Sequence, residues 1–324
     1  MLSYDNIRQV HLEISTRCNA ACPGCPRNLC GVDILDDYPL LDMKLEQAQK
    51  IFPRDFLTQL DRILINGNYG DFVTARDGLA IVEYFKTANP NLEIIISTNA
   101  SAMPQIWQRL GELAVTVKFR IDGLADTHKL YRQNTNWDAI IANANNFIKA
   151  GGTAIWAMIL FDHNRHQTGQ CRQLSRELGF SHFELIDQGR STMPVFDKDK
   201  QLTHTIGKYT DTRDFEVIHK LYVDHEYSKF QLKADMPKRK IKCQAQEHNE
   251  IYVAANGDIS PCCWLGFYPQ HGLSHPSNIQ IRSIANKNNA LEYDIKTAIE
   301  WFGDIEKTWD KERPVYACYE TCGK

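Results

Sequence analysis

Three cysteines near the amino terminus constrain this chain more than any other feature. Cys18, Cys22 and Cys25 lie within the segment TRCNAACPGCP. Three thiolates can hold a four-iron cluster while one iron keeps an open position, just as three protein ligands leave the fourth position of a catalytic zinc ion free. The segment therefore predicts a metal site at which a reactant binds.

The cysteine spacing resembles the signature of the radical S-adenosylmethionine (radical SAM) superfamily, and a strand-like segment from His11 to Ile14 directly precedes it. The resemblance implies that Cys18, Cys22 and Cys25 bind a 4Fe–4S cluster, whose open iron is chelated by the amino and carboxylate groups of S-adenosylmethionine. Reduction of the cluster, by an external donor of the flavodoxin or ferredoxin kind, then cleaves the sulfonium. The resulting 5′-deoxyadenosyl radical abstracts a substrate hydrogen, and the protein supplies position and redox tuning.

Other uses of cysteine fit this segment less well. Zinc knuckles normally pair two close sets of ligands, and no second close pair lies near Cys25. Disulfide frameworks belong mainly to short secreted chains, whereas this chain has 324 residues, ten cysteines and no apolar stretch near Met1 that could act as a signal peptide. A non-catalytic iron–sulfur protein is the alternative from another functional class, and it predicts a closed cluster without cleavage of S-adenosylmethionine.

Composition limits the partners. No apolar run approaches the roughly 20 residues that span a bilayer, so no membrane partner is expected. A formal charge of −3 gives no electrostatic basis for bulk nucleic-acid binding. Iron–sulfur ligation needs reduced thiols, which predicts a cytoplasmic location.

Strand-like and helix-like segments alternate as far as about Asp187, which predicts parallel strands joined by helical crossovers. Strands are expected at Val10 to Ile14, Arg62 to Asn66, Glu93 to Thr98, Val115 to Ile121, Ala154 to Leu160 and His182 to Ile186. Amphipathic stretches predict helices at Lys44 to Leu60, Phe72 to Ala88, Trp137 to Ala150 and Gln167 to Leu178. The pattern resembles the partial (β/α)6 TIM-like barrel of radical SAM enzymes. We therefore expect an α/β fold with a barrel domain at 1–190, a bridging segment at 191–240 and a small domain at 241–324.

Barrel enzymes place their chemistry at the carboxyl ends of the strands, and three loops there resemble binding motifs of the family. A glycine-rich run after the second strand resembles the motif that binds the methionine amino group, with Asp71 where the family often has glutamate. A threonine-asparagine turn after the third strand resembles the one near the adenosyl group. Arg132, twelve residues after Arg120, falls where the family has an arginine that grips the methionine carboxylate, and Arg120 is a second candidate for that contact. The cofactor-binding candidates are Gly67, Asn68, Tyr69, Gly70, Thr98, Asn99, Arg120 and Arg132.

A polar cluster from Phe161 to Gln167 follows the fifth strand. His163 is the candidate proton acceptor in this cluster, because histidine titrates near neutral pH. Asn164 has a simpler alternative role as the cap of a helix that begins near Gln167.

A second cysteine group lies in the carboxyl-terminal region. Cys243, Gly257 and Cys262, with thirteen and then four residues between them, resemble the opening of the SPASM and twitch domains that follow some radical SAM barrels. Between them, Glu250 to Ala254 and Asp258 to Pro261 predict a hairpin that turns at Asn256-Gly257. The chain has too few cysteines after Gly257 for a full SPASM domain, so the shorter twitch domain with one auxiliary 4Fe–4S cluster is the better match.

The resemblance gives the auxiliary cluster four ligands, namely Cys243, Cys262, Cys318 and Cys322. Cys262 is preferred to Cys263 by spacing, because neighbouring residues of a strand face opposite sides. Three residues separate Cys318 from Cys322, whereas the family often has two. A zinc ion stays an alternative, since four cysteines suit it equally well. Cys30 and Cys171 are expected to be structural thiols.

The auxiliary cluster favours an oxidation, because a closed cluster near the substrate can accept the electron that a substrate radical loses. Epimerisation would need a hydrogen donor instead, and Cys263 or Cys30 could serve only if it faced the barrel mouth. The resemblance points to peptide or protein substrates, as in the maturation of ribosomally made peptides, with a radical dehydrogenase of a small molecule as the alternative. Because the cluster motif begins at residue 18, we expect leader recognition by a separate protein or direct docking in the barrel.

Overall fold

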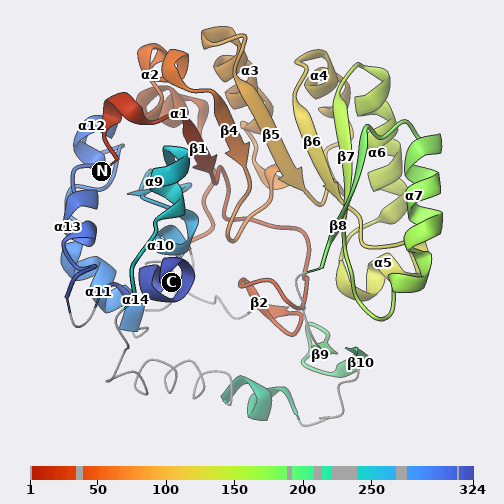
Figure 1. The fold of residues 1–324 in the computed structure, drawn as a ribbon. Helices are drawn as coiled ribbons and strands as arrows, with labels where there is room; N and C mark the ends of the chain where they lie inside the picture. Colours follow the sequence, from red (N-terminus) through yellow and green to blue (C-terminus); the bar gives the residue numbers. More distant parts are fainter. Residues whose placement is uncertain are drawn as a thin grey trace.

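A sheet of parallel strands forms the centre of the computed structural model, which describes residues 2–33, 39–187, 192–207, 214–220, 239–267, 276–311 and 314–324. Its strand order is β12-β11-β1-β4-β5-β6-β7-β8, and Figure 1 shows the part from β1 to β8. The run from β1 to β8 is parallel throughout and follows chain order. These strands are β1 (Gln9–Leu12), β4 (Arg62–Ile65), β5 (Glu93–Thr98), β6 (Thr116–Arg120), β7 (Thr153–Ile159) and β8 (His182–Ile186). The predicted α/β fold with a six-stranded partial TIM-like barrel is confirmed.

The two faces of this sheet have different characters because successive residues of a strand point to opposite sides. On β6, Phe119 is fully buried and its ring packs against Trp107 of α4 (Trp107–Glu112) and Phe147 of α6 (Trp137–Lys149). Lys118 points the other way and forms an ion pair with Glu184 of β8 at 2.9 Å. The helix-covered face of β6 therefore packs into the apolar core, whereas its opposite face carries a charged pair.

Two of the predicted helices are divided in the structure. Lys44 to Leu60 contains α1 (Leu45–Ile51) and α2 (Arg54–Gln59), and Pro53 between them is the N-cap residue of α2, because proline cannot donate the hydrogen bond that a helix interior needs. Phe72 to Ala88 contains a 3-10 turn, η2 (Phe72–Thr74), and α3 (Gly78–Ala88). The other two predictions are confirmed as α6 and as α7 (Thr168–Glu177), which follows the 3-10 turn η3 (Arg165–Gln167).

The carboxyl-terminal hairpin continues the barrel sheet. β11 (Glu250–Val253) pairs in parallel with β1 and in antiparallel fashion with β12 (Ile259–Ser260). The predicted turn is confirmed, and Gly257 adopts φ +88°, a conformation that favours glycine. Short helices gather beside β1 in Figure 1. They are α9 (Gln244–His248), α10 (Cys263–Phe267), α11 (Pro276–Ile284), α12 (Ile295–Ala298), α13 (Phe302–Glu306) and α14 (Tyr316–Cys322).

Two small hairpins were not expected from the sequence. β2 (Asn28–Leu29) pairs with β3 (Val32–Asp33), and β9 (Met193–Phe196) pairs with β10 (Leu202–Ile206). The second hairpin lies in the segment expected to bridge two domains. The proposed boundary at residue 190 lies outside the described residues, and the division into domains stays a prediction. No helix in the described ranges is both long and apolar enough to cross a membrane.

Candidate active site

A cavity of about 260 Å³ lies at the carboxyl ends of the parallel strands. Its lining contains the three amino-terminal cysteines together with every residue that the sequence predicted for cofactor binding. These residues are Cys18, Cys22, Cys25, Gly67, Asn68, Tyr69, Gly70, Thr98, Asn99, Arg120 and Arg132. Loops from four different strands thus converge on one space.

The cysteine loop is partly buried, with Cys22 buried and Cys18 and Cys25 half-buried, and hydrogen bonds hold it. The Cys25 amide donates to the Cys22 carbonyl at 3.0 Å, and the Ala20 amide lies 3.4 Å from the Cys18 sulfur. Burial raises the pKa of both Cys18 and Cys22, while the positive charge of Arg132 opposes the rise at Cys22. Free thiols in this place are therefore protonated near neutral pH, and they become thiolates when a cationic metal group binds them.

Gly70 joins the glycine-rich loop to the segment that leads into Cys18. A Cβ atom on Gly70 would lie only 1.8 Å from the Ser15 carbonyl oxygen, so no larger residue fits without backbone movement. The next amide, that of Asp71, donates to the Arg17 carbonyl at 2.8 Å. This close approach fixes the glycine-rich loop relative to the first cysteine.

Glu13 supports the same loop, and the sequence reasoning did not identify it. Its carboxylate is fully buried and accepts hydrogen bonds from the Tyr69 amide at 2.7 Å and the Gly70 amide at 3.1 Å. The second oxygen accepts from the Tyr252 hydroxyl of β11 at 2.6 Å. Burial raises the pKa of Glu13, and these hydrogen bonds counteract part of the rise. An acidic residue inside the strand predicted from Val10 to Ile14 was the available signal.

Asp71 positions the threonine-asparagine turn. It accepts hydrogen bonds from the Thr98 hydroxyl, from the Asn99 amide at 2.8 Å and from Asn99 Nδ2 at 2.9 Å. Asn99 Nδ2 also donates to Asn19 Oδ1 at 2.9 Å, next to the first cysteine. Burial raises the pKa of Asp71, and the hydrogen bonds act against it. The carboxylate therefore connects three segments of the cavity wall.

The two predicted arginines line the cavity, and each already has a protein partner. Arg132 Nε pairs with the fully buried Asp122 at 2.6 Å, while Arg132 Nη1 lies 3.7 Å from the Cys22 sulfur. Burial alone would lower the pKa of Arg132, but Asp122 and the other anionic neighbours raise it, so the guanidinium stays charged. Arg120 Nε donates to Ser97 Oγ at 2.8 Å. The structure thus places Arg132 beside the cysteine loop, where one nitrogen of its guanidinium, Nε, is already paired with Asp122.

His163 is not among the residues that line the cavity. Its ring stacks on that of Phe161, with 5.1 Å between the ring centroids. The Phe161 ring in turn packs on the cavity-lining Tyr131, with 4.5 Å between the centroids. Both ring nitrogens of His163 are buried and have no hydrogen-bond partner among the described residues. Burial lowers the pKa of His163, which favours the neutral ring that can accept a proton.

Asn164 stands at the N-cap position of the η3 turn, as the alternative role predicted, but its side chain forms no capping hydrogen bond. This side chain is fully buried. Asn164 Oδ1 accepts from the Phe161 amide at 2.8 Å, and Nδ2 donates to the Ile159 carbonyl at 2.9 Å. These two hydrogen bonds close the loop at the end of β7, and they occupy the side-chain oxygen that a helix cap would need.

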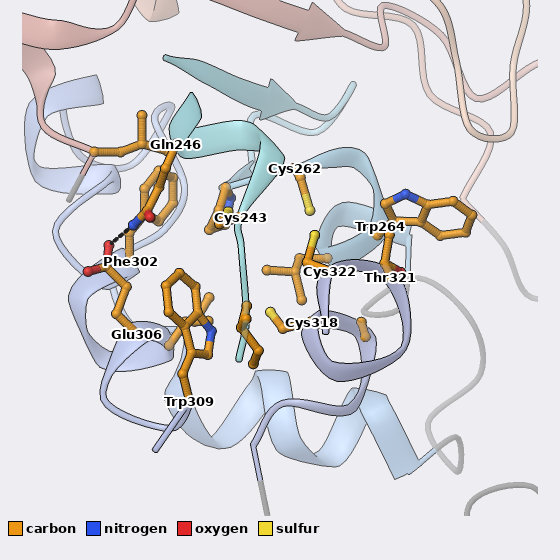
Figure 2. Close-up of a pocket in the computed structure, with 16 residues that line it drawn as sticks. Cys243, Gln246, Cys262, Trp264, Phe302, Glu306, Trp309, Cys318, Thr321 and Cys322 are labelled. Atoms are coloured by element: carbon orange, nitrogen blue, oxygen red, sulfur yellow. Dashed lines mark hydrogen bonds between the residues drawn. The ribbon is translucent and has the colours of Figure 1, made fainter. Parts of the chain in front are cut away.

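A second pocket is lined by four of the five cysteines of the carboxyl-terminal region, namely Cys243, Cys262, Cys318 and Cys322 (Figure 2). Cys318 and Cys322 lie four residues apart on α14, which places both thiols on one face of the helix and explains the three-residue gap. Cys243 directly precedes α9, and Cys262 directly precedes α10. Cys263 does not line this pocket.

This second pocket is largely apolar, with Leu265, Phe302 and Ile305 among its lining residues. Burial raises the pKa of the Cys318 thiol to about 12 and also raises those of Cys243 and Cys262. Across the described ranges, no group of three or more His, Cys, Asp or Glu side chains is arranged to hold a single metal ion. All ten cysteines are free thiols.

Cys30 and Cys263 line neither pocket. Burial raises the pKa of each to about 11, so both are ordinary protonated thiols near neutral pH. The Cys263 carbonyl accepts from Asn68 Nδ2 at 3.0 Å, which connects the carboxyl-terminal region to the glycine-rich loop. This geometry gives no support to either thiol as a hydrogen donor at the barrel mouth.

Comparison with known proteins identifies the fold. No family model and no curated protein matches the sequence. Among solved structures, SuiB of Streptococcus suis matches with a TM-score of 0.54 and 15% identity, over 95% of this chain and 66% of that one. The structure of anSMEcpe with bound AdoMet matches with a TM-score of 0.54 and 15% identity, over 90% and 77% of the two chains.

A further anSMEcpe structure, with bound AdoMet and a Cp18Cys peptide, matches with a TM-score of 0.54 and 14% identity, over 91% of this chain and 80% of that one. This chain thus spans 66 to 80% of the length of these three structures. At such low identity the likeness concerns the fold alone. The chain has the fold of these proteins.

Proposed function

We propose that this protein is a radical SAM enzyme. The observation that carries the proposal is the meeting of the three-cysteine loop, the glycine-rich loop and the threonine-asparagine turn around one cavity at the carboxyl ends of the strands. A pure electron carrier has no need of such a cavity. In structures of the same fold, SuiB and anSMEcpe are bound to S-adenosylmethionine.

The donor set fits the proposed groups. Cys18, Cys22 and Cys25 would hold a 4Fe–4S cluster, and Arg132 beside Cys22 would counter its negative charge. With S-adenosylmethionine bound, the reduced cluster would supply a 5′-deoxyadenosyl radical that abstracts a substrate hydrogen. Glu13 holds the Tyr69 and Gly70 amides, and so fixes the loop that resembles the methionine-binding motif.

The carboxyl-terminal pocket supports an auxiliary 4Fe–4S cluster of the twitch type, bound by Cys243, Cys262, Cys318 and Cys322. Each thiolate of such a cluster binds a different iron, so the sulfurs stand further apart than around one ion. A zinc ion bound by the same four thiolates is the alternative, and iron, zinc and sulfide analysis distinguishes the two. Four ligands would leave no iron open, and such a cluster suits electron relay in an oxidation.

A peptide or protein is the substrate class that we propose. SuiB has been determined with its precursor peptide SuiA, and anSMEcpe with peptides. Oxidation of a small molecule is the alternative. An external reductant, a separate leader-recognition protein and a cytoplasmic location, where thiols stay reduced, complete the proposal. His163 would act as proton acceptor only if substrate binding opened a path past Phe161.

The test is anaerobic reconstitution with iron and sulfide, followed by dithionite reduction with S-adenosylmethionine and an assay for 5′-deoxyadenosine. The test variant carries Cys18→Ala, Cys22→Ala and Cys25→Ala, and the matched control is Cys171→Ala, which removes a buried thiol that lines neither pocket. We expect deoxyadenosine from the wild type and the control, with about four irons lost from the triple variant alone. A fully loaded wild type that forms none, with several reductants and candidate peptides, would favour an electron-transfer protein.

A further inference from the structure

Trp309 is an unusual neighbour for the four carboxyl-terminal cysteines. It follows α13 and lines their pocket, as Figure 2 shows. Its indole Nε1 is buried and has no hydrogen-bond partner among the described residues. An unsatisfied buried donor costs about 1–3 kcal/mol, so a donor in this position calls for an acceptor that binding supplies.

The pocket that Trp309 lines offers cysteine sulfur as an acceptor. The polar pair in the same pocket, Gln246 and Glu306, is already joined by a hydrogen bond of 2.6 Å. Cys318 lines the same pocket as Trp309, and Figure 2 shows the Cys318 side chain beside the Trp309 indole. Sulfur that ligates iron carries negative charge, which makes it a stronger acceptor than a neutral thiol.

We propose that Trp309 donates a hydrogen bond to the Cys318 sulfur when the auxiliary cluster is bound, and that it thereby raises the reduction potential of this cluster. The inference rests on the proposed auxiliary cluster and assigns a positioning and tuning residue to it. Hydrogen bonds to cluster sulfurs stabilise the more negative, reduced state, and they are among the factors that set the potential. Trp309 would therefore help the second cluster accept an electron.

Trp301 provides a matched control in the same region. It is buried, and its indole Nε1 donates to the Ile259 carbonyl at 3.2 Å instead of facing the cysteines. Phenylalanine at either position removes an indole N–H and keeps an aromatic ring. Only the change at Trp309 removes a donor from the cluster.

The experiment uses the full chain with Cys18→Ala, Cys22→Ala and Cys25→Ala, so that the auxiliary cluster alone contributes to a redox titration followed by electron paramagnetic resonance. Adding Trp309→Phe should lower the midpoint potential, with roughly a tenfold change in the reduction equilibrium, about 59 mV for one electron. Adding Trp301→Phe should leave the potential unchanged. Equal potentials for the parent and a fully loaded Trp309→Phe protein would overturn the inference and leave the proposed function intact.

Iron and sulfide counts distinguish two outcomes: a bound auxiliary cluster whose potential does not depend on Trp309, and a protein that binds no such cluster. A parent protein that binds zinc, or no iron, would overturn both the auxiliary cluster and the role of Trp309. If Trp309→Phe does not load, the parent itself gives the answer after labelling with 15N-indole tryptophan. A hyperfine coupling between one 15N nucleus and the reduced cluster is expected in pulsed resonance spectra, and its absence would contradict the hydrogen bond.

Discussion

The two cysteine groups differ in the backbone that holds them and in what surrounds them. Cys18, Cys22 and Cys25 stand on an irregular loop beside a polar cavity of about 260 Å³. The other group stands on helix starts and on one face of α14, enclosed mainly by apolar side chains. Three ligands beside an open polar cavity suit a site that binds a reactant, whereas four ligands in an apolar enclosure suit a site that only exchanges electrons.

The largest expected effect tests whether the four-cysteine pocket binds a cluster independently of Cys18, Cys22 and Cys25. Cys322→Ser should remove a ligand and with it the auxiliary cluster, about four irons per chain. Cys263→Ser is the matched control, because Cys263 is next to the proposed ligand Cys262 in sequence but does not line the pocket. Iron and sulfide analysis measures both, and deoxyadenosine formation should survive in each variant. Equal iron loss from the two variants would contradict the ligand set.

The next effect concerns the open site, which depends on close backbone packing. Gly70→Ala places a Cβ atom against the Ser15 carbonyl and should displace the glycine-rich loop. Since a displacement of about 1 Å can cost 100-fold in rate, we expect a roughly 100-fold or larger loss of S-adenosylmethionine cleavage. Gly169→Ala, where the added carbon meets no atom within 4 Å, should have no such effect. Wild-type cleavage by Gly70→Ala would show that the loop does not position the cofactor.

A third test concerns the contact at which the two regions meet. Tyr252→Phe removes the hydroxyl that donates to Glu13, and Glu13→Gln changes the acceptor. Each single change should lower the free energy of unfolding by about 2 kcal/mol, because a buried group loses a charge-assisted hydrogen bond. Denaturant unfolding of the two single variants and the double variant gives their coupling. Additive effects would mean that this hydrogen bond does not connect the regions.

The barrel was predictable because its signals are local. Apolar strands alternate with amphipathic helices, and polar motifs follow the strand ends, so the strands and the cavity-lining residues could be identified from the sequence. Pro53 could also have predicted the break between α1 and α2. Proline at that position ends one helix and suits the start of the next.

The supporting contacts of the site were not predictable in the same way. Glu13 joins residues far apart in the sequence, and only the parallel pairing of β11 with β1 brings Tyr252 to it. The spacing of Cys318 and Cys322 looked irregular until α14 placed both on one helical face. Trp309 belongs to no sequence motif. It stands out only in the structure, because its buried indole Nε1 has no hydrogen-bond partner among the described residues.

The smallest expected effect is a difference in how the stability of the two cysteine regions depends on pH. His128 is buried near the open site, and its Nδ1 accepts from the Asp122 amide at 3.1 Å, which requires a neutral ring. Burial lowers the pKa of His128 to about 4. Below its ordinary value of 6.5 the unfolded chain binds a proton that the folded protein does not, so this contribution to stability is complete above pH 6.5 and is lost as pH falls toward 4.

Between pH 7 and 5.5 the wild type should therefore lose about 1 kcal/mol more unfolding free energy than His128→Asn. Denaturant titrations at the two pH values measure the difference, with His166→Asn as the exposed control. No histidine lines the described part of the four-cysteine pocket, so its packing should not share this dependence. If the unfolding free energy of wild type and of His128→Asn responded equally to pH, the His128 ring would accept a proton without disturbing Asp122. The region around the three-cysteine cavity would then be no more sensitive to acid than the four-cysteine pocket.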